Sequence, residues 1–302
     1  MSTLTINKDL INTTLEYNSF VIPKDAKLLI CGIRGAVLQV PNDNDFKASQ
    51  TLLLSDLNYK NPRCTILLYN LQNAEIAAYP ASTVPHIKNI SASILKKGMG
   101  TNCLMTGFYR DYRKGVHKPQ SPTGHAALRQ TAPHPIRRST DDEDYDNDDR
   151  IEYVNPFDNI HSGWFQSIDS ESYASAGCQV IMGYPACTLP GREKGVGPWA
   201  KFQSNIYKSS QQSFAYLLVS ARELIQISTN KDPKRRKLKF GSQGDIVKEL
   251  QEKLAKLHYY EGKPDGDFGE RTLKAVLSFQ QGVFGKEGAD GVVGDLTWEQ
   301  LS

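Results

Sequence analysis

Two kinds of hydrophobic pattern divide the chain. Up to about residue 228, apolar residues come in short runs that are separated by Asn, Asp, Gly and Pro, a pattern typical of short strands joined by long loops. The predicted strands are Lys27–Cys31, Ala36–Val40, Cys64–Tyr69, Gln179–Met182 and a closing strand at Phe214–Val219. Helices are predicted at Phe46–Leu54 and Pro198–Tyr207. The pattern therefore indicates a mainly β domain with few helices.

Beyond residue 239 the apolar period changes to that of a helix. One helical face carries Ile246, Val247, Leu250, Leu254 and Leu257, after a plausible cap at Gly244 and Asp245. A second helix is predicted from Glu270 to Gln280, and a third begins near Leu296. This part is expected to be a small all-α domain of three helices.

The stretch between these two patterns is polar and basic. Residues 228–239 read STNKDPKRRKLK and contain six basic residues and Pro233. We interpret 229–239 as a solvated linker between a domain at 1–228 and a domain at 240–302, with 1–61 as a possible separate docking or accessory segment. Alternatives for the basic run are an import or nucleic-acid patch and attraction to anionic wall polymers.

The composition mainly argues against certain classes of partner and structure. The chain has 302 residues and a net charge of +3, which gives no reason to expect nucleic acid as a partner. No apolar run approaches the ~20 residues of a membrane span, and Met1–Phe20 lacks the pattern of a secretory signal. The five cysteines are odd in number and form no CxxC pair, so neither a disulfide framework nor a zinc finger is indicated.

A repeated motif marks the C-terminal domain. Asp265-Gly266-x-Phe268-Gly269 and Asp290-Gly291-x-Val293-Gly294 are each followed by a Thr in the first turn of a predicted helix, where its hydroxyl can reach the loop backbone. With Gly241-x-x-Gly244, Leu250-Gln251, Tyr259-Tyr260, Phe279-Gln280 and Thr297-Trp298, this region resembles the peptidoglycan-binding domain of bacterial and phage wall hydrolases. The resemblance implies a three-helix bundle that binds wall peptide or glycan.

The ligand contacts of this domain are fixed only loosely by the resemblance. The substrate-binding candidates are Tyr259, Tyr260, Asp265 and Phe268. The aromatic residues among them could equally belong to the core. A domain that has kept the fold and lost the binding is the alternative.

Candidate chemistry in the β domain centres on a thiol. Cys178 follows Gly177, and His161 lies 17 residues upstream. A cysteine nucleophile needs a nearby base, and two adjacent strands joined by a loop could bring this pair together. Free N–H groups near Gly177 and Cys178 could then cradle an oxyanion.

These residues resemble the catalytic motif of L,D-transpeptidases, a His followed by Ser/Thr-x-Gly-Cys. The closest likeness is to the phage and prophage lysis subgroup, through Asn159-Ile160-His161 and Ser175-x-Gly177-Cys178-Gln179. The resemblance implies a β-sandwich with few helices, Cys178 as nucleophile, His161 as general base, Ser175 as an orienting residue, and His117 and Gln179 at the substrate. It implies acyl transfer on wall stem peptides, without a metal or cofactor.

The motif departs from the family pattern at two positions. Ala176 stands where the family has His, and Val180 stands where it has Asn or Arg. Because the polar residue helps to hold a substrate carboxylate or the active loop, a hydrolase is as plausible as a transferase.

Three alternatives accompany this interpretation. The acidic stretch 141–149 is interpreted as a solvated hairpin rather than a calcium loop, because Tyr153 stands where an EF-hand has Glu. A metallopeptidase using His117, His125 and His161 has no supporting spacing. A non-catalytic part of a phage tail or contractile injection apparatus would also act at the bacterial wall after synthesis in the cytoplasm without a signal peptide.

Overall fold

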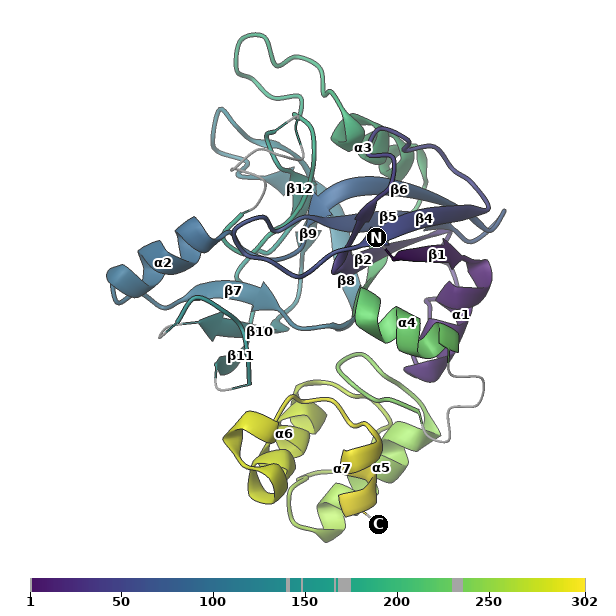
Figure 1. Cartoon of the computed structure of the whole chain (residues 1–302), viewed down its shortest axis with the longest axis vertical. Helices are drawn as coiled ribbons and strands as arrows, with labels where there is room; N and C mark the ends of the chain where they lie inside the picture. Colours follow the sequence, from purple (N-terminus) through teal and green to yellow (C-terminus); the bar gives the residue numbers. More distant parts are fainter. Residues whose placement is uncertain are drawn as a thin grey trace.

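The structure is a computed structural model, and it describes residues 2–139, 142–147, 149–165, 167, 175–229 and 236–301. Its upper part is mainly β and its C-terminal part is helical (Figure 1). The predicted linker falls largely on residues 230–235, which lie outside the described residues. The mainly β character of the N-terminal region and the helical character of the C-terminal region are both confirmed.

Eight strands form a closed ring in the order β12-β13-β6-β5-β2-β14-β8-β9. They are β2 (Leu28–Arg34), β5 (Cys64–Asn70), β6 (Glu75–Ser82), β8 (Gly107–His117), β9 (His125–Gln130), β12 (Ile160–Ser162), β13 (Gln179–Ile181) and β14 (Ser213–Ser220). The sequence predicts a sandwich, whereas these strands close into a barrel. Closure between β9 and β12 rests on the single pair Leu128 and Ile160, a long-range contact without a local sequence pattern.

The strands of the barrel are apolar on both faces because each face has a core of its own. In β2, Leu29, Cys31 and Ile33 pack beneath the helices α1 (Lys8–Tyr17) and α4 (Ala221–Thr229). Leu28 and Ile30 point to the other side, into the barrel. Alternate residues of a strand face opposite sides of a sheet, so burial on both sides produces a continuous apolar run.

The first sixty residues are woven into the β domain. Strand β1 (Thr3–Asn7) pairs with β4 (Ser49–Leu54), which also pairs with β3 (Ala36–Leu38). The helix predicted at Phe46–Leu54 is therefore wrong. A run of three leucines fits a helix or a strand, and the partner strand that decides lies some forty residues away in the sequence.

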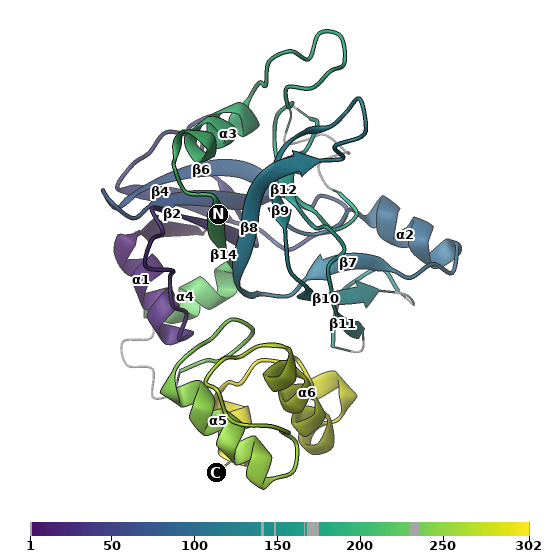
Figure 2. The same cartoon turned by 180° about the vertical axis from the view of Figure 1, so that it is seen from behind.

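Further elements flank the barrel. A second small sheet has the order β11-β10-β7, from β7 (Thr101–Leu104), β10 (His134–Ser139) and β11 (Arg150–Val154). Helix α2 (Ile87–Leu95) lies beside this sheet, and helix α3 (Pro198–Lys208) covers one end of the barrel, as seen from behind in Figure 2. The helix predicted at Pro198–Tyr207 is confirmed. Among the described residues, no helix is long and apolar enough to span a membrane.

The C-terminal region has the three predicted helices, α5 (Asp245–Lys256), α6 (Glu270–Phe284) and α7 (Asp295–Gln300), with a short 3₁₀ turn at Lys286–Gly288. A buried glutamine holds each repeated loop. Gln251 accepts hydrogen bonds from the backbone of Asp265 and Gly266 and donates to Asp265, Asp267 and Thr272. Gln280 does the same for Asp290, Gly291, Val292 and Thr297. The predicted contact of the Thr272 hydroxyl with the loop backbone is confirmed, at the carbonyl of Asp267.

The helical region packs directly on the β domain. The amide of Gln243 donates to the carbonyl of Ser19 at 2.8 Å, and the amide of Phe108 donates to the carbonyl of Phe240 at 3.0 Å. Nζ of Lys239 lies 2.6 and 2.8 Å from the two carboxylate oxygens of Glu223 on α4, and both side chains are buried. Covalent connection through 230–235 is thus reinforced by contacts that fix how the two regions meet.

Candidate active site

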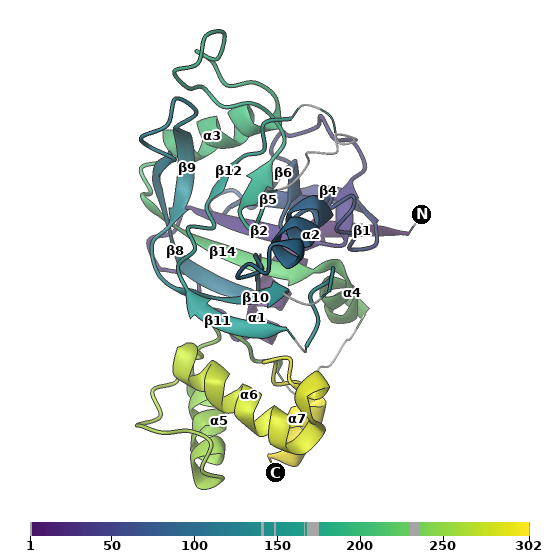
Figure 3. The same ribbon diagram turned by 90° about the vertical axis from the view of Figure 1, so that its left-hand side faces the viewer.

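The thiol and its candidate base come from neighbouring strands of the barrel. β12 and β13 are parallel, and His161 pairs with Val180. Cys178 immediately precedes β13, so its side chain emerges beside the start of β12. Figure 3 shows β12 between β9 and β6, the strands that flank this pair. The prediction that adjacent strands bring this part of the chain together is confirmed.

Two imidazoles face the thiol. A ring nitrogen of His161, a ring nitrogen of His117 and Sγ of Cys178 all lie within 4.8 Å of one another. The two rings are stacked, with centroids 3.9 Å apart and planes at 11°. His117 ends strand β8 and is half-buried, whereas His161 is 7 % exposed. The candidate nucleophile and base are thus close neighbours with a second histidine beside them, while the thiol donates to the carbonyl of Phe157 at 3.6 Å.

His125 on β9 fixes the tautomer of His161. Nδ1 of His125 lies 2.7 Å from the carbonyl oxygen of Thr123, which can only accept, so this Nδ1 carries the proton. Nε2 of neutral His125 is then an acceptor, and it lies 3.3 Å from Nδ1 of His161. His161 therefore carries its proton on Nδ1. Its Nε2 remains unprotonated and is the nitrogen able to take the thiol proton.

The turn before the thiol is held by Ser175. Its hydroxyl donates to the carbonyl of Cys178 at 2.7 Å and accepts from the amide of Gly177 at 3.1 Å. The carbonyl of Ser175 accepts from the His86 amide at 3.2 Å and the Asn89 side chain at 3.0 Å. Ser175 thus holds the turn, a contact of the kind that the orienting role implied by the resemblance would require.

Gly177 leaves space for a buried acid. A Cβ on Gly177 would lie 2.6 Å from Oδ1 of Asp158 and 2.9 Å from Nδ2 of Asn102. Asp158 is 2 % exposed and accepts from Asn102 through both oxygens, at 3.0 and 3.1 Å. Asn102 in turn accepts from Arg138 at 2.6 Å. Any side chain larger than glycine at 177 would push the turn away from this group.

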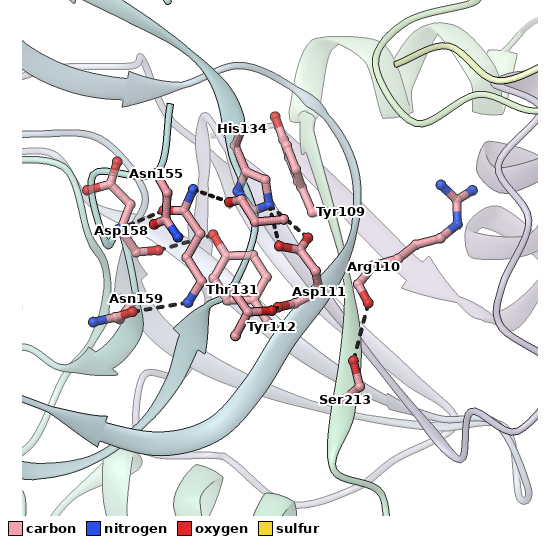
Figure 4. A network of polar contacts seen from close by, with 12 residues as sticks. Tyr109, Arg110, Asp111, Tyr112, Thr131, His134, Asn155, Asp158, Asn159 and Ser213 are labelled. Carbon is pink, nitrogen blue, oxygen red and sulfur yellow. Dashed lines mark hydrogen bonds and ion pairs between the residues drawn. The ribbon is translucent and has the colours of Figure 1, made fainter. Parts of the chain in front are cut away.

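A polar network on the side of β8 and β10 supports Asp158 and Asn159 (Figure 4). The hydroxyl of Tyr112 donates to the carbonyl of Asp158 at 3.1 Å. The ring of Tyr112 lies against His134, whose Nε2 is 2.8 and 3.0 Å from the carboxylate oxygens of Asp111. The loop that leads into β12 is therefore anchored to β8 and β10.

Burial sets the resting charge state. It raises the pKa of the Cys178 thiol to about 12, and negative Asp158 acts in the same direction. It lowers the pKa of His161 well below its ordinary value, with His117 and His125 adding to the effect. Burial raises the pKa of Asp158 to about 7. The thiol and the imidazole are consequently both neutral at rest, so an attack by this sulfur would require transfer of its proton.

Gln179 lies inside the barrel and not on a surface open to substrate. It is 0 % exposed, and its amide donates to the carbonyl of Gly177 at 3.1 Å and accepts from Tyr216 at 3.0 Å. Its contacts hold the catalytic turn from the core side. The first residue of a short strand can face either way, and only the barrel shows which.

The candidate residues of the helical region are divided between core and surface. Phe268 is fully buried, and Tyr260 is 5 % exposed. Asp265 is exposed but accepts from Gln251 at 2.8 Å and pairs with Arg271 at 3.2 Å. Tyr259 is 36 % exposed and packs edge-on against Phe279. Tyr259 and Asp265 thus remain accessible, whereas Phe268 forms the core.

The tautomer of His117 is set by Asn159. Oδ1 of Asn159 accepts from the amide of Gln130 at 3.1 Å, which turns its Nδ2 toward Nδ1 of His117, 3.0 Å away. Nδ1 of His117 is therefore an acceptor, and the ring proton lies on Nε2. His117 thus presents a lone pair at Nδ1 to Asn159 and its N–H at Nε2.

A second group of close oxygen ligands lies in the acidic loop. Asp142, Asp144 and Asp146 are exposed, and residues 140, 141 and 148 lie outside the described part of the chain. Oδ1 of Asp142 already accepts from the amide of Asp144 at 3.0 Å.

The sequence did not single out Asp158 and Asn102, because their importance depends on the space beside Gly177. His125 appeared only as one of three possible metal ligands. Asn159 stands within the Asn-Ile-His motif, which is the one sequence feature that could have pointed to it.

Comparison with known proteins identifies the helical region. Residues 243–301 match the family model described as "Putative peptidoglycan binding domain". The chain is 46% identical over 61 residues to a spore cortex-lytic enzyme of Bacillus subtilis (strain 168), which covers 20% of each protein. It is 40% identical over 80 residues to the chloroplastic protein disulfide isomerase pTAC5 of Arabidopsis thaliana, covering 25% of this chain and 20% of that one. No solved structure matches.

The C-terminal region is thus a peptidoglycan-binding domain. This chain spans about a fifth of the length of the curated relatives that it matches. The family match is confined to this region and does not extend to the β domain.

Proposed function

We propose that this protein is a cysteine-dependent enzyme that modifies peptidoglycan by acyl transfer on the stem peptides. Its β domain is proposed to carry the chemistry of the L,D-transpeptidase-like family, and its C-terminal domain to anchor it to the wall. The single observation that carries the proposal is the approach of Cys178 to His161, within 4.8 Å, at the start of two paired strands. The name of the spore cortex-lytic relative supports a wall-directed activity.

In the proposed reaction, Sγ of Cys178 attacks the carbonyl carbon of a stem-peptide bond while Nε2 of His161 takes the thiol proton. The S–C bond forms, the C–N bond breaks, and His161 returns the proton to the leaving amine. Water or a second amine then attacks the thioester and regenerates the thiol. Because the resting pair is neutral, His161 acts as a true general base rather than as the partner of a preformed thiolate.

The residue after Gln179 bears on whether water or an amine attacks the thioester. Val180 is 1 % exposed and packs with Phe165 and Met182, so no polar side chain extends from there toward a substrate. Hydrolysis and transpeptidation are both within the proposal, and the mass of the products distinguishes them.

The test compares wild type, Cys178→Ala and Cys187→Ala on purified muropeptides, with products identified by mass spectrometry. Cys187 is half-buried and lies outside the candidate site, so its variant is the matched control for loss of a thiol. We expect new products from wild type and Cys187→Ala and none from Cys178→Ala. Three identical spectra that match untreated substrate would overturn the proposal and favour a non-catalytic, wall-docking part of a tail or injection apparatus.

A further inference from the structure

The proposed reaction lacks one hydrogen-bond donor. A tetrahedral oxyanion is usually held by two donors, and the sequence suggested the amides of Gly177 and Cys178. The amide of Gly177, however, already donates to the Ser175 hydroxyl at 3.1 Å. The ring N–H of a histidine beside the thiol is a candidate for a further donor.

His117 meets the chemical requirement. Its Nδ1 accepts from Asn159, whose orientation is fixed by the amide of Gln130, so the proton of the neutral ring lies on Nε2. Burial lowers the pKa of His117 to about 4, with His125 adding to the effect, so the ring stays neutral at physiological pH and keeps this single N–H. A neutral imidazole is a fixed donor that does not compete with His161 for the thiol proton.

His117 also lies beside the thiol. It stacks on His161 at 3.9 Å, and one of its nitrogens lies within 4.8 Å of Sγ. The Asn159 contact occupies Nδ1, so Nε2 is the nitrogen that is free to meet a substrate. The ring is half-buried at the end of β8, whereas His161 lies deeper.

We infer that His117 is a catalytic residue that donates Nε2–H to the oxyanion formed at Cys178, while His161, stacked beneath it, is the base. The inference rests on the proposed function for the identity of the biological substrate. The chemistry at Cys178 can be tested without that substrate. Two identical side chains thus have opposite roles, because His125 makes one a base and Asn159 makes the other a donor.

The first experiment reads the tautomers without any turnover. In the full chain labelled with ¹⁵N-histidine, two-bond ¹H–¹⁵N correlation spectra near neutral pH distinguish the two tautomers of each ring. We expect the proton on Nε2 in His117 and on Nδ1 in His161, with assignment from the His117→Gln and His161→Gln variants. A proton on Nδ1 of His117 would overturn the inference.

The second experiment separates oxyanion formation from thiol activation, in a Cys187→Ala background. Acylation of Cys178 by p-nitrophenyl acetate forms a tetrahedral oxyanion; its S–C bond forms, nitrophenolate leaves and His161 takes the thiol proton. Alkylation by iodoacetamide forms no oxyanion. We expect His117→Leu to slow acylation about 100-fold while alkylation changes less than about threefold.

Matched variants decide between a donor and a base. Gln offers an N–H at nearly the reach of Nε2, so we expect His117→Gln to recover at least about tenfold of the acylation rate lost in His117→Leu, with the pH profile of wild type. Equal losses in Gln and Leu, or no loss in Leu, would overturn the inference. The exposed His258→Gln is the control for a histidine substitution. If wild type acylates but cuts no muropeptide, the proposed function fails while the role of His117 stands.

Discussion

At the scale of the residue, the candidate site is governed by protons whose positions follow from hydrogen-bond partners. The carbonyl of Thr123 fixes the ring proton of His125 on Nδ1, and His125 in turn fixes the ring proton of His161 on Nδ1. Asn159 fixes the ring proton of His117 on the other nitrogen, Nε2. Each histidine alone is ambiguous, and the chain of contacts removes the ambiguity.

Replacing His125 by Phe keeps an aromatic ring against Trp164 but removes the acceptor for Nδ1–H of His161. His161 can then adopt the other tautomer, with Nε2 protonated and unable to act as a base. We expect kcat on muropeptides to fall about 100-fold with KM nearly unchanged. Iodoacetamide alkylation of Cys178 should slow as well, unlike in His117→Leu. Unchanged kcat in His125→Phe would exclude His125 as the residue that positions His161.

Asp158 makes a prediction about pH. Burial raises the pKa of its folded-state carboxyl to about 7 from 3.8, so between these values the folded chain binds a proton that the unfolded chain has lost. Stability from this group therefore decreases as pH rises through 7. In urea unfolding, we expect the free energy of unfolding of Asp158→Asn, taken relative to that of wild type, to increase by about 2–3 kcal/mol between pH 5 and pH 8.

The comparison with the variant is needed because the buried histidines act in the opposite direction. The pKa of His117, His125 and His161 is lowered on folding, so their contribution to stability is lost as pH falls below their ordinary value. These groups are common to both proteins and cancel in the difference. A difference that is constant from pH 5 to 8 would contradict the raised pKa of Asp158.

At the scale of the element, apolar patterns predicted four of the helices and five of the strands, but not the remaining strands or how the strands close. The helices α3, α5, α6 and α7 lie where periodicity places them. The strand at Ser49–Leu54 was mistaken for a helix because its partner, β1, lies far away in the sequence. Barrel closure, and hence the buried position of Gln179, depends equally on distant partners.

The site itself was predictable only in part. A His and a Ser-x-Gly-Cys motif pointed to the candidate nucleophile and base, because the residues around Cys178 are adjacent in the sequence. Asn102 and Asp158 contribute through the space beside Gly177, which exists only after β7 has folded beside the catalytic turn.

The two repeated loops of the helical domain are each held by one buried glutamine. Gln251 is fully buried, and replacement by Leu leaves the amides of Asp265 and Gly266 and the hydroxyl of Thr272 without this partner. We expect Gln251→Leu to lower the free energy of unfolding of the domain by about 2–4 kcal/mol and to weaken retention on purified peptidoglycan. Exposed Gln281→Leu on α6 is the matched control and should change stability by less than about 0.5 kcal/mol. Equal stabilities of the two variants would refute the role of Gln251.

At the scale of the whole molecule, the wall-binding domain is held against the β domain by three separate segments. The turn at Asn18–Phe20, the start of β8 and helix α4 all contact residues 239–243. Gly241 fits against the carbonyl of Phe108, where a side chain would overlap it. The contact between Asn18 and Ser242 joins residues 224 positions apart, which no local pattern could predict. These contacts therefore fix the orientation of the helical domain relative to the β domain that carries the candidate site.

The buried ion pair between Glu223 and Lys239 tests this arrangement. Removing one partner leaves a buried charge without compensation, so we expect Lys239→Met and Glu223→Leu each to destabilise the chain by about 3–5 kcal/mol in urea unfolding. The double variant should be more stable than either single one, because neither charge is then left alone. The exposed pair Glu270 and Lys274 is the control, and its loss should cost no more than about 0.5 kcal/mol. Strictly additive losses in the double variant would show that the two side chains act independently, and the contact would then not be what fixes the anchor to the β domain.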